Sequence, residues 1–163
     1  MSPVTDAATA AAPGSLALDP LQREVLGEEL AALVASIRAP EVRANWDELA
    51  AAVDQGSVAS ELAGRLETLL DMVLQTGRAR KMHGAEAEQA LLRLFYQTPR
   101  GAAARRAMQA VNETLATLEG HSLTGMLFTV QGPGSFRLGL TTDRCRLTLD
   151  IDPHGVAVES LEV

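Results

Sequence analysis

The fold class follows from residues 135–152, which read SFRLGLTTDRCRLTLDID. Apolar and polar side chains alternate here with a period of two, as in a β-strand with one buried and one exposed face. If Thr142 and Asp143 form a two-residue loop, every apolar side chain of the two flanking strands falls on one face of an antiparallel hairpin. The cross-strand pairs expected from that loop are Leu140–Cys145, Leu138–Leu147 and Phe136–Leu149.

A further strand is expected on each side of this hairpin. Before it, residues 123–130 alternate in the same way and end at Gln-Gly-Pro-Gly, residues 131–134, which reads as a turn. After it, residues 152–155 read Asp-Pro-His-Gly, the composition of a type I turn, and lead into a last strand. Residues 121–163 therefore predict a four-stranded antiparallel β-meander.

The last strand, residues 156–163, is expected to be irregular. Its apolar side chains keep one parity as far as Val158 and take the other at Leu161. Because a β-bulge adds one residue to one strand of a pair, this slip predicts a bulge near Ser160.

Residues 19–119 carry apolar side chains at three- and four-residue steps, the spacing of amphipathic helices. The first helix has a clear start signal, because Asp19 and Pro20 read as an N-cap and a first helical residue, and Gln22 stands at the capping-box position. Prolines and glycines mark the other boundaries. The five expected helices cover residues 20–37, 40–56, 57–76, 85–97 and 99–120, with a basic connector at 77–84.

The chain is therefore predicted to be an α+β protein, with five helices followed by a meander that packs against them. Residues 1–18 are rich in alanine and interrupted by proline, and we expect a disordered tail there. Residues 19–163 are expected to form a single domain, with a helical part at 19–119 and the meander at 121–163.

The composition narrows the class of protein. The 163 residues include 27 Ala and 24 Leu but only 3% aromatic residues, so helix formers supply the apolar fraction. The single cysteine excludes an intramolecular disulfide, and the N-terminus lacks the basic region and apolar core of a signal peptide. No run is long enough to span a membrane, so we expect a cytoplasmic protein. The bias toward Ala, Arg, Gly and Leu suggests a GC-rich bacterial genome.

The net charge of −7 conceals a basic segment. Residues 1–72 carry −8, residues 73–106 carry +5 and residues 107–163 carry −4. The basic segment either complements the acidic helices internally or receives an anionic partner. Nucleic acid is the less favoured partner, because a chain with this net charge is repelled by it. The candidate binding residues are Arg78, Arg80, Lys81, His83, Arg100, Arg105 and Arg106.

The polar face of the predicted sheet is a second candidate surface. Arg137 and Arg146 are expected to project from it on adjacent strands, with Arg144 nearby. Such a face could engage an acidic helix of the same chain or of another subunit, or it could simply face water.

No familiar catalytic constellation is evident. His83, His121 and His154 are far apart and lack the three- or four-residue spacing of helical metal ligands, so no metal or cofactor is expected. Cys145 is expected to be a small core residue. The acid pair Glu28-Glu29 is expected on a solvated helix face. The turn at 131–134 leads into a strand, whereas a phosphate-binding loop leads into a helix.

The sequence therefore predicts a protein that is not an enzyme. The favoured hypothesis is a scaffold or accessory subunit that works through protein contacts, including association into a homodimer. The alternative is a regulatory binder of an anionic ligand or nucleic acid through residues 78–106. An active site shared between subunits stays open, and His83 and Cys145 would be the first residues to substitute.

Overall fold

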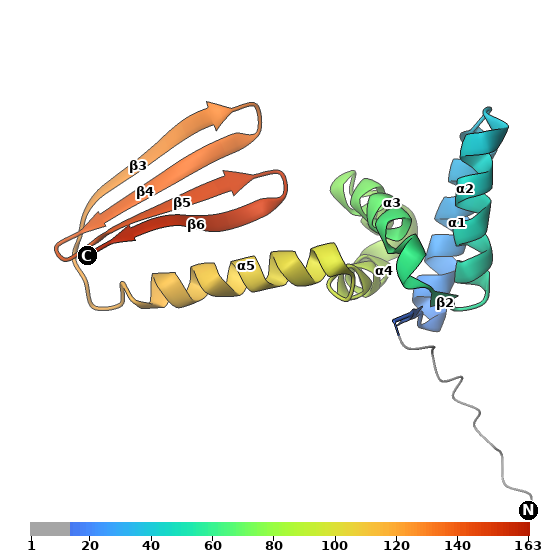
Figure 1. The fold of residues 1–163 in the computed structure, drawn as a ribbon, viewed down its shortest axis with the longest axis horizontal. Coiled ribbons are helices and arrows are strands. Elements are labelled where there is room, and N and C mark those ends of the chain that lie inside the picture. Colours follow the sequence, from blue (N-terminus) through green and yellow to red (C-terminus); the bar gives the residue numbers. More distant parts are fainter. Residues whose placement is uncertain (1–13) are drawn as a thin grey trace, which may run out of the picture. The chain divides into compact units, whose positions relative to one another are not determined.

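A computed structural model describes residues 14–163 of the chain (Figure 1). These residues form five α-helices, a four-stranded antiparallel sheet and a two-stranded sheet, so the predicted α+β class is confirmed. The fold divides into two compact units, one that ends at Pro99 and one that runs from Arg100 to Val163. Each unit has its own buried apolar cluster.

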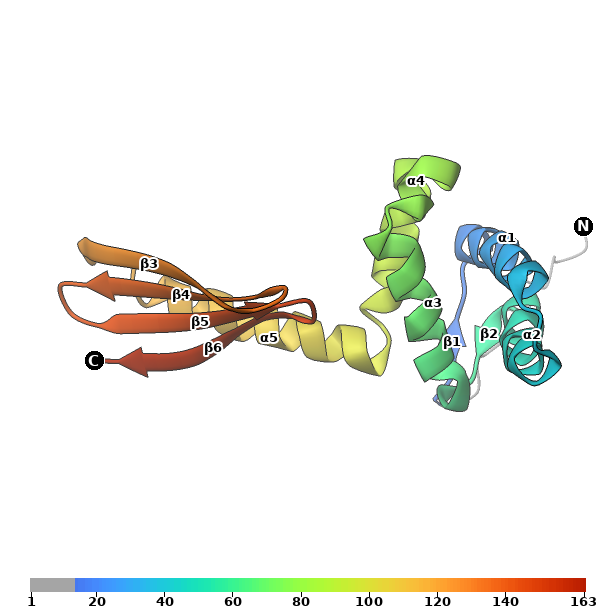
Figure 2. The ribbon, with the colours of Figure 1, turned by 90° about the horizontal axis from the view of Figure 1, so that it is seen from above.

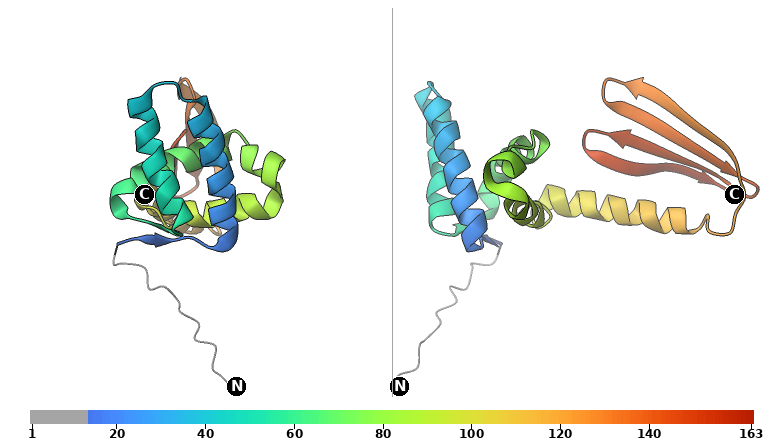
Figure 3. Two further views of the ribbon diagram at one scale, coloured as in Figure 1. Left: turned by 90° about the vertical axis from the view of Figure 1, so that its right-hand side faces the viewer. Right: turned by 180° about the vertical axis from the view of Figure 1, so that it is seen from behind.

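The first unit contains four helices and the short two-stranded sheet. α1 and α2 lie side by side (Figure 3), and α4 contacts both α1 and α3. Its elements are β1 (Leu16–Ala17), α1 (Pro20–Ser36), α2 (Pro40–Asp54), β2 (Ser57–Val58), the 3₁₀ turn η1 (Ser60–Leu62), α3 (Ala63–Gln75) and α4 (Arg78–Phe95).

The capping box at the start of α1 is confirmed. The Asp19 carboxylate accepts a hydrogen bond from the Gln22 backbone N–H at 2.8 Å, and the Gln22 Oε1 accepts one from the Asp19 N–H at 2.9 Å. The Gln22 side chain also donates to the Ala90 carbonyl oxygen of α4 at 2.9 Å in a buried position. Gln22, which takes part in the cap of α1, therefore also joins α1 to α4.

The prediction that a helix begins at residue 57 was wrong. Leu16 pairs with Val58 and Ala17 with Ser57, and both Leu16 and Val58 pack in the core of the first unit. This pairing joins segments about 40 residues apart, so local periodicity cannot reveal it. It also shortens the expected N-terminal tail, of which residues 1–13 lie outside the described residues.

The basic connector expected at 77–84 is helical, which corrects the prediction of a loop. Gly77, at φ +66°, separates α3 from α4, and α4 begins at the next residue. Ala79 is fully buried, so the first turn of α4 packs against the core. Gly84 then interrupts the helix at φ +91°, a conformation that favours glycine. Gly77 and Gly84 each mark a break in the helical chain, and the residues between them are helical.

The second unit contains one helix and the meander. The strands follow one another across the sheet in sequence order, with β3 and β6 at its two edges (Figure 2). One face packs on α5, where Val111 is buried together with Leu147 and Leu149. Its elements are α5 (Pro99–Ala116), β3 (Leu123–Gly132), β4 (Ser135–Thr142), β5 (Arg146–Asp152) and β6 (Gly155–Glu162).

The predicted faces of the central hairpin are correct, but the predicted register is off by two residues. The pairs are Leu140–Leu147, Leu138–Leu149 and Phe136–Ile151. The loop is longer than expected because the Thr142 hydroxyl accepts hydrogen bonds from the backbone N–H groups of Arg144 and Cys145. A slip of two residues keeps each side chain on its face.

The irregularity of the last strand is confirmed. Thr148 pairs with Ser160 and Leu149 with Val158, so Glu159 is the extra residue of the bulge. The Asp152 carboxylate accepts hydrogen bonds from two backbone N–H groups of the turn before β6, as the turn composition predicts. No helix within residues 14–163 is both long and apolar enough to span a membrane.

Candidate functional site

The edge strand β3 exposes apolar side chains on both faces of the sheet. Met126, Phe128 and Val130 lie on the face that packs on α5, yet they are 69%, 57% and 72% exposed. Leu127, on the opposite face, is 66% exposed, and Leu123 at the start of the strand is 59% exposed. Soluble proteins rarely leave so many neighbouring apolar side chains open unless something binds there.

The cause of this exposure is the position of α5 over the sheet. Val111 of α5 packs on β5, and the partly buried side chains around it come from β4, from β6 and from Leu118, just after α5. None of the residues of this cluster belongs to β3. Phe128 stacks on its neighbour Phe136, with ring centroids 5.4 Å apart, and is still 57% exposed. The helix therefore covers three strands and leaves the fourth open.

The two edges of the sheet differ in how they are protected. β3 is ten residues long and contains neither a charged residue nor a proline. β6 carries Glu159 and Glu162 and is interrupted by the bulge. Charges and bulges are the usual means by which an edge strand avoids pairing with another chain. The pairing of β3 with β4 also shifts register near both ends of the strand, between Leu123 and Gly125 and between Val130 and Gly132. Between these shifts, residues 125–130 form a regular edge without a charged side chain, whereas the bulge of β6 lies at Glu159.

Part of the basic segment contacts the acidic helix α1. The Arg78 Nε donates a hydrogen bond to Glu29 at 2.6 Å, and the His83 Nε2 donates to the other carboxylate oxygen at 2.8 Å. The His83 Nδ1 lies 3.6 Å from a carboxylate oxygen of Glu28. Arg78 and His83 thus complement acidic residues of their own unit, which is one of the alternatives that the sequence leaves open.

Glu29 was expected on a solvated face, and this expectation was wrong. Its side chain is only 6% exposed. Burial raises the pKa of the Glu29 carboxyl, but the hydrogen bonds from His83 and Arg78 and their charges outweigh burial and hold its pKa below the ordinary value. Glu29 is therefore a buried carboxylate held by two basic side chains.

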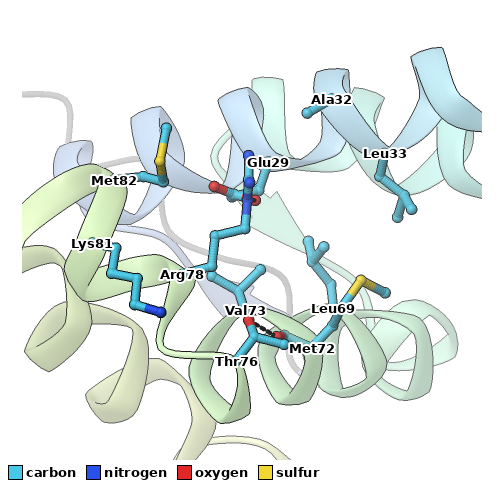
Figure 4. Close-up of a pocket in the computed structure, with 10 residues that line it drawn as sticks. All are labelled: Glu29, Ala32, Leu33, Leu69, Met72, Val73, Thr76, Arg78, Lys81 and Met82. Carbon is cyan, nitrogen blue, oxygen red and sulfur yellow. Dashed lines mark hydrogen bonds and ion pairs between the residues drawn. The ribbon is translucent and has the colours of Figure 1, made fainter.

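A groove of about 550 Å³ lies beside this cluster, between α1 and α3 and against the start of α4 (Figure 4). Arg78 and Lys81 line it, whereas Arg80 lies 3.8 Å from Glu88 of its own helix. Apolar side chains supply most of the remaining surface. The lining residues are Glu29, Ala32, Leu33, Leu69, Met72, Val73, Thr76, Arg78, Lys81 and Met82.

The remaining basic candidates belong to the second unit. Arg105 and Arg106 are exposed on α5, and Arg100 Nη2 lies 3.4 Å from the His154 Nδ1. The basic segment at 78–106 is thus divided between the two compact units, so its basic residues do not form one cluster within either unit.

The arginines predicted on the polar face of the sheet do lie there in part. Arg137 donates two hydrogen bonds to Asp150, at 2.7 and 3.0 Å. These bonds hold the pKa of Asp150 below its ordinary value and raise that of Arg137. Arg146 lines a shallow depression of this face together with Arg137, whereas Arg144 lies in the hairpin loop beside Asp143.

Cys145 lies in the hairpin loop and not in a strand, which corrects the prediction of a core cysteine. Its Sγ is 3.7 Å from the His121 Nδ1 and 3.4 Å from the Thr142 hydroxyl. Cys145 and His121 are 24 positions apart in the chain, so their spacing in the sequence did not predict this contact. Among the described residues, no group of three or more histidine, cysteine or acidic side chains is arranged to hold a metal ion.

No family model, curated protein or solved structure is similar to the chain. The geometry of β3 and of the groove beside Glu29 is therefore what bears on function. The signal for β3 was present in the sequence, because residues 123–132 are the longest part of the predicted meander without a charged residue. No sequence signal indicated that Glu29 is buried, because the burial of a residue on a helix face depends on which other helices pack against that face.

Proposed function

We propose that the protein is a non-catalytic scaffold or assembly subunit that works through protein contacts made by β3. The observation that carries this proposal is the uncharged edge of β3, which pairs regularly with β4 over residues 125–130 and exposes apolar side chains on both faces of the sheet. An exposed edge strand binds another strand through main-chain hydrogen bonds, and its side chains supply the apolar contact.

A second copy of the chain is the partner that best fits this edge. Identical strands related by a two-fold axis pair antiparallel, and the absence of charge on β3 means that self-pairing brings no like charges together. An axis perpendicular to the sheet keeps α5 of both copies on the same face. The exposed side chains of Met126, Phe128 and Val130 from both copies would then form one apolar band.

The protected edge at β6 limits this association to a dimer. If both edges were open, sheets would add to one another without end. Glu159 and the bulge make β6 unsuitable for pairing, so two copies joined at β3 present no further open edge. The five exposed apolar side chains of β3 lie along this one edge, so pairing with a second copy would cover apolar surface as well as main-chain groups.

The alternative function, binding of an anionic ligand or nucleic acid through all of residues 78–106, has less support. In the first unit only Arg78 and Lys81 of this set line the groove, His83 is engaged with Glu29, and the arginines at 100–106 belong to the other unit. The repulsion expected from the net charge of −7 also opposes nucleic acid.

Sedimentation equilibrium of the full chain across the micromolar range tests the proposal. We expect a reversible monomer–dimer equilibrium, and we expect Leu127→Lys to weaken it by about tenfold or more, because it places two lysines at the proposed interface. Leu127 faces solvent and has no role in the core. The matched control is Ala157→Lys, on exposed β6, which should leave the dissociation constant within about twofold. A monomer at high micromolar concentration would contradict the proposal, as would equal effects of the two variants.

A further inference from the structure

The groove beside Glu29 has the features of a small-molecule site. Its volume of about 550 Å³ falls within the range of about 300–1,000 Å³ that is usual for ligand pockets. Leu33 of α1 and Leu69 and Met72 of α3 line it from opposite sides, and the first turns of α4 border one end (Figure 4). It lies wholly within the first unit.

The apolar part of the groove is adaptable. Met72 and Met82 both line it and are 43% and 62% exposed, which is high for side chains of this type. Methionine is flexible and polarisable and is common on surfaces that accept apolar ligands of varied shape. Met72 lies at the apolar end of the groove beside Leu33 and Leu69, and Met82 lies at the charged end beside Lys81 (Figure 4), so each end has one adaptable side chain.

The charged end of the groove is held in a fixed arrangement. Glu29 accepts from the Arg78 Nε, which leaves the terminal Nη groups of a side chain that is 46% exposed. His83 in turn holds the second oxygen of Glu29. Within residues 14–163, Lys81 forms no ion pair with an acidic side chain. The groove thus presents one oriented guanidinium and one available ammonium.

The burial of Glu29 is costly, and this cost favours a role beyond packing. Removing a carboxylate from water is repaid by its partners only when the geometry is good, and an apolar residue of similar size is often at least as stabilising. What the buried carboxylate achieves here is to orient Arg78 at the groove. Glu29 is in this sense a positioning residue.

The charge of the groove selects the ligand. Glu29, Arg78 and Lys81 are its charged lining residues, and together they carry +1. A monoanion neutralises this charge, whereas a phosphate dianion exceeds it. A guanidinium matches the planar carboxylate in shape and donor geometry.

We propose that this groove binds an amphipathic monocarboxylate, with its carboxylate between Arg78 and Lys81, next to Met82, and its hydrocarbon chain along Leu33, Leu69 and Met72. A fatty acid with roughly eight to twelve carbons suits a pocket of this volume. This site is independent of the pairing of β3, so either proposal can fail without the other.

Methyl NMR of the full chain, labelled at the methionine methyl groups and titrated with decanoate below its micelle concentration, tests the proposal. The methyl signals of Met72 and Met82 should shift and saturate together. The signal of Met108, which belongs to the second unit and lies outside β3, should stay unchanged and serves as the internal control. Decanol, which has the same chain without the charge, should bind about tenfold more weakly.

Two pairs of variants sharpen the test. Ala32→Trp, on an exposed position that lines the groove, should fill it and abolish binding, whereas its neighbour Ala31→Trp, which lines a different surface of α1, should not. Lys81→Ala should weaken binding by about tenfold, and Arg80→Ala, outside the groove, should leave it within about twofold.

Several outcomes would overturn the proposal. These are the absence of a saturable shift at Met72 and Met82, equal shifts at Met108, equal affinity for decanol and decanoate, and loss of binding in Ala31→Trp as complete as in Ala32→Trp.

Discussion

The two units of the chain differ in how much of their apolar surface they bury. The first unit buries fifteen apolar side chains in one cluster drawn from all four of its helices. The second buries three, and its strand β3 leaves large apolar side chains open to solvent. The comparison teaches that a single helix of 18 residues does not cover a four-stranded sheet. The helices of the first unit cover one large apolar core, whereas in the second unit α5 leaves the apolar side chains of β3 uncovered.

The largest test of this comparison uses two fully buried leucines, Leu70 in the first unit and Leu147 in the second. Replacement of either by alanine should lower the free energy of unfolding of its own unit by about 3 kcal/mol, because it removes apolar contact and leaves a cavity. Trp46, the only tryptophan, packs against the core of the first unit. Its fluorescence in a urea titration therefore reports on that unit.

We expect Leu70→Ala to move the Trp46 transition to lower urea and Leu147→Ala to leave it unchanged. A Trp46 transition that moves equally in both variants would mean that the units unfold together, as the single domain predicted from the sequence would do. That result would contradict the description of two units with separate cores.

A smaller effect distinguishes the two acid–base pairs. Glu29 is buried with Arg78 and His83, whereas Asp150 pairs with Arg137 on an exposed face of the sheet. Glu29→Gln should lower the free energy of unfolding of the first unit by about 2 kcal/mol, because it removes the charged acceptor of two partly buried hydrogen bonds. Asp150→Asn should have little effect, because solvent screens an exposed pair.

The same pair predicts how stability depends on pH. The pKa of Glu29 in the folded chain lies below its ordinary value near 4.5, so its contribution is present above that value and is lost as the pH falls through the folded pKa. Urea titrations followed by Trp46 at decreasing pH should show a steeper loss in the wild-type chain than in Glu29→Gln below about pH 5. Parallel curves for the two proteins would contradict the account of Glu29.

Much of the fold could be predicted because its signals are local. The capping box of Asp19 and Gln22 depends on residues three positions apart, and the faces of the strands depend on parity alone. The parity slip before Leu161 was sufficient to predict the bulge. The register of the hairpin was not predictable in this way, because it depends on the Thr142 hydroxyl capping the loop.

The candidate sites were predicted only in part, for the same reason. Arg78, Lys81 and His83 were recognisable as a basic cluster, but Glu29 gained its role from the packing of α1 against α4, which no local pattern encodes. The exposure of Met126 and Phe128 follows from the reach of α5 over the sheet. Whether a neighbouring element covers an apolar strand is a property of tertiary structure and not of the strand.

Hydrogen exchange of the backbone amides of β3 and β6, measured from low to high micromolar protein, tests the central claim most directly. If β3 pairs with a second copy, its outward amides gain protection as the concentration rises, while those of β6 do not change. Leu127→Lys should remove this gain. Amides of β3 that exchange at the same rate at every concentration would contradict the account.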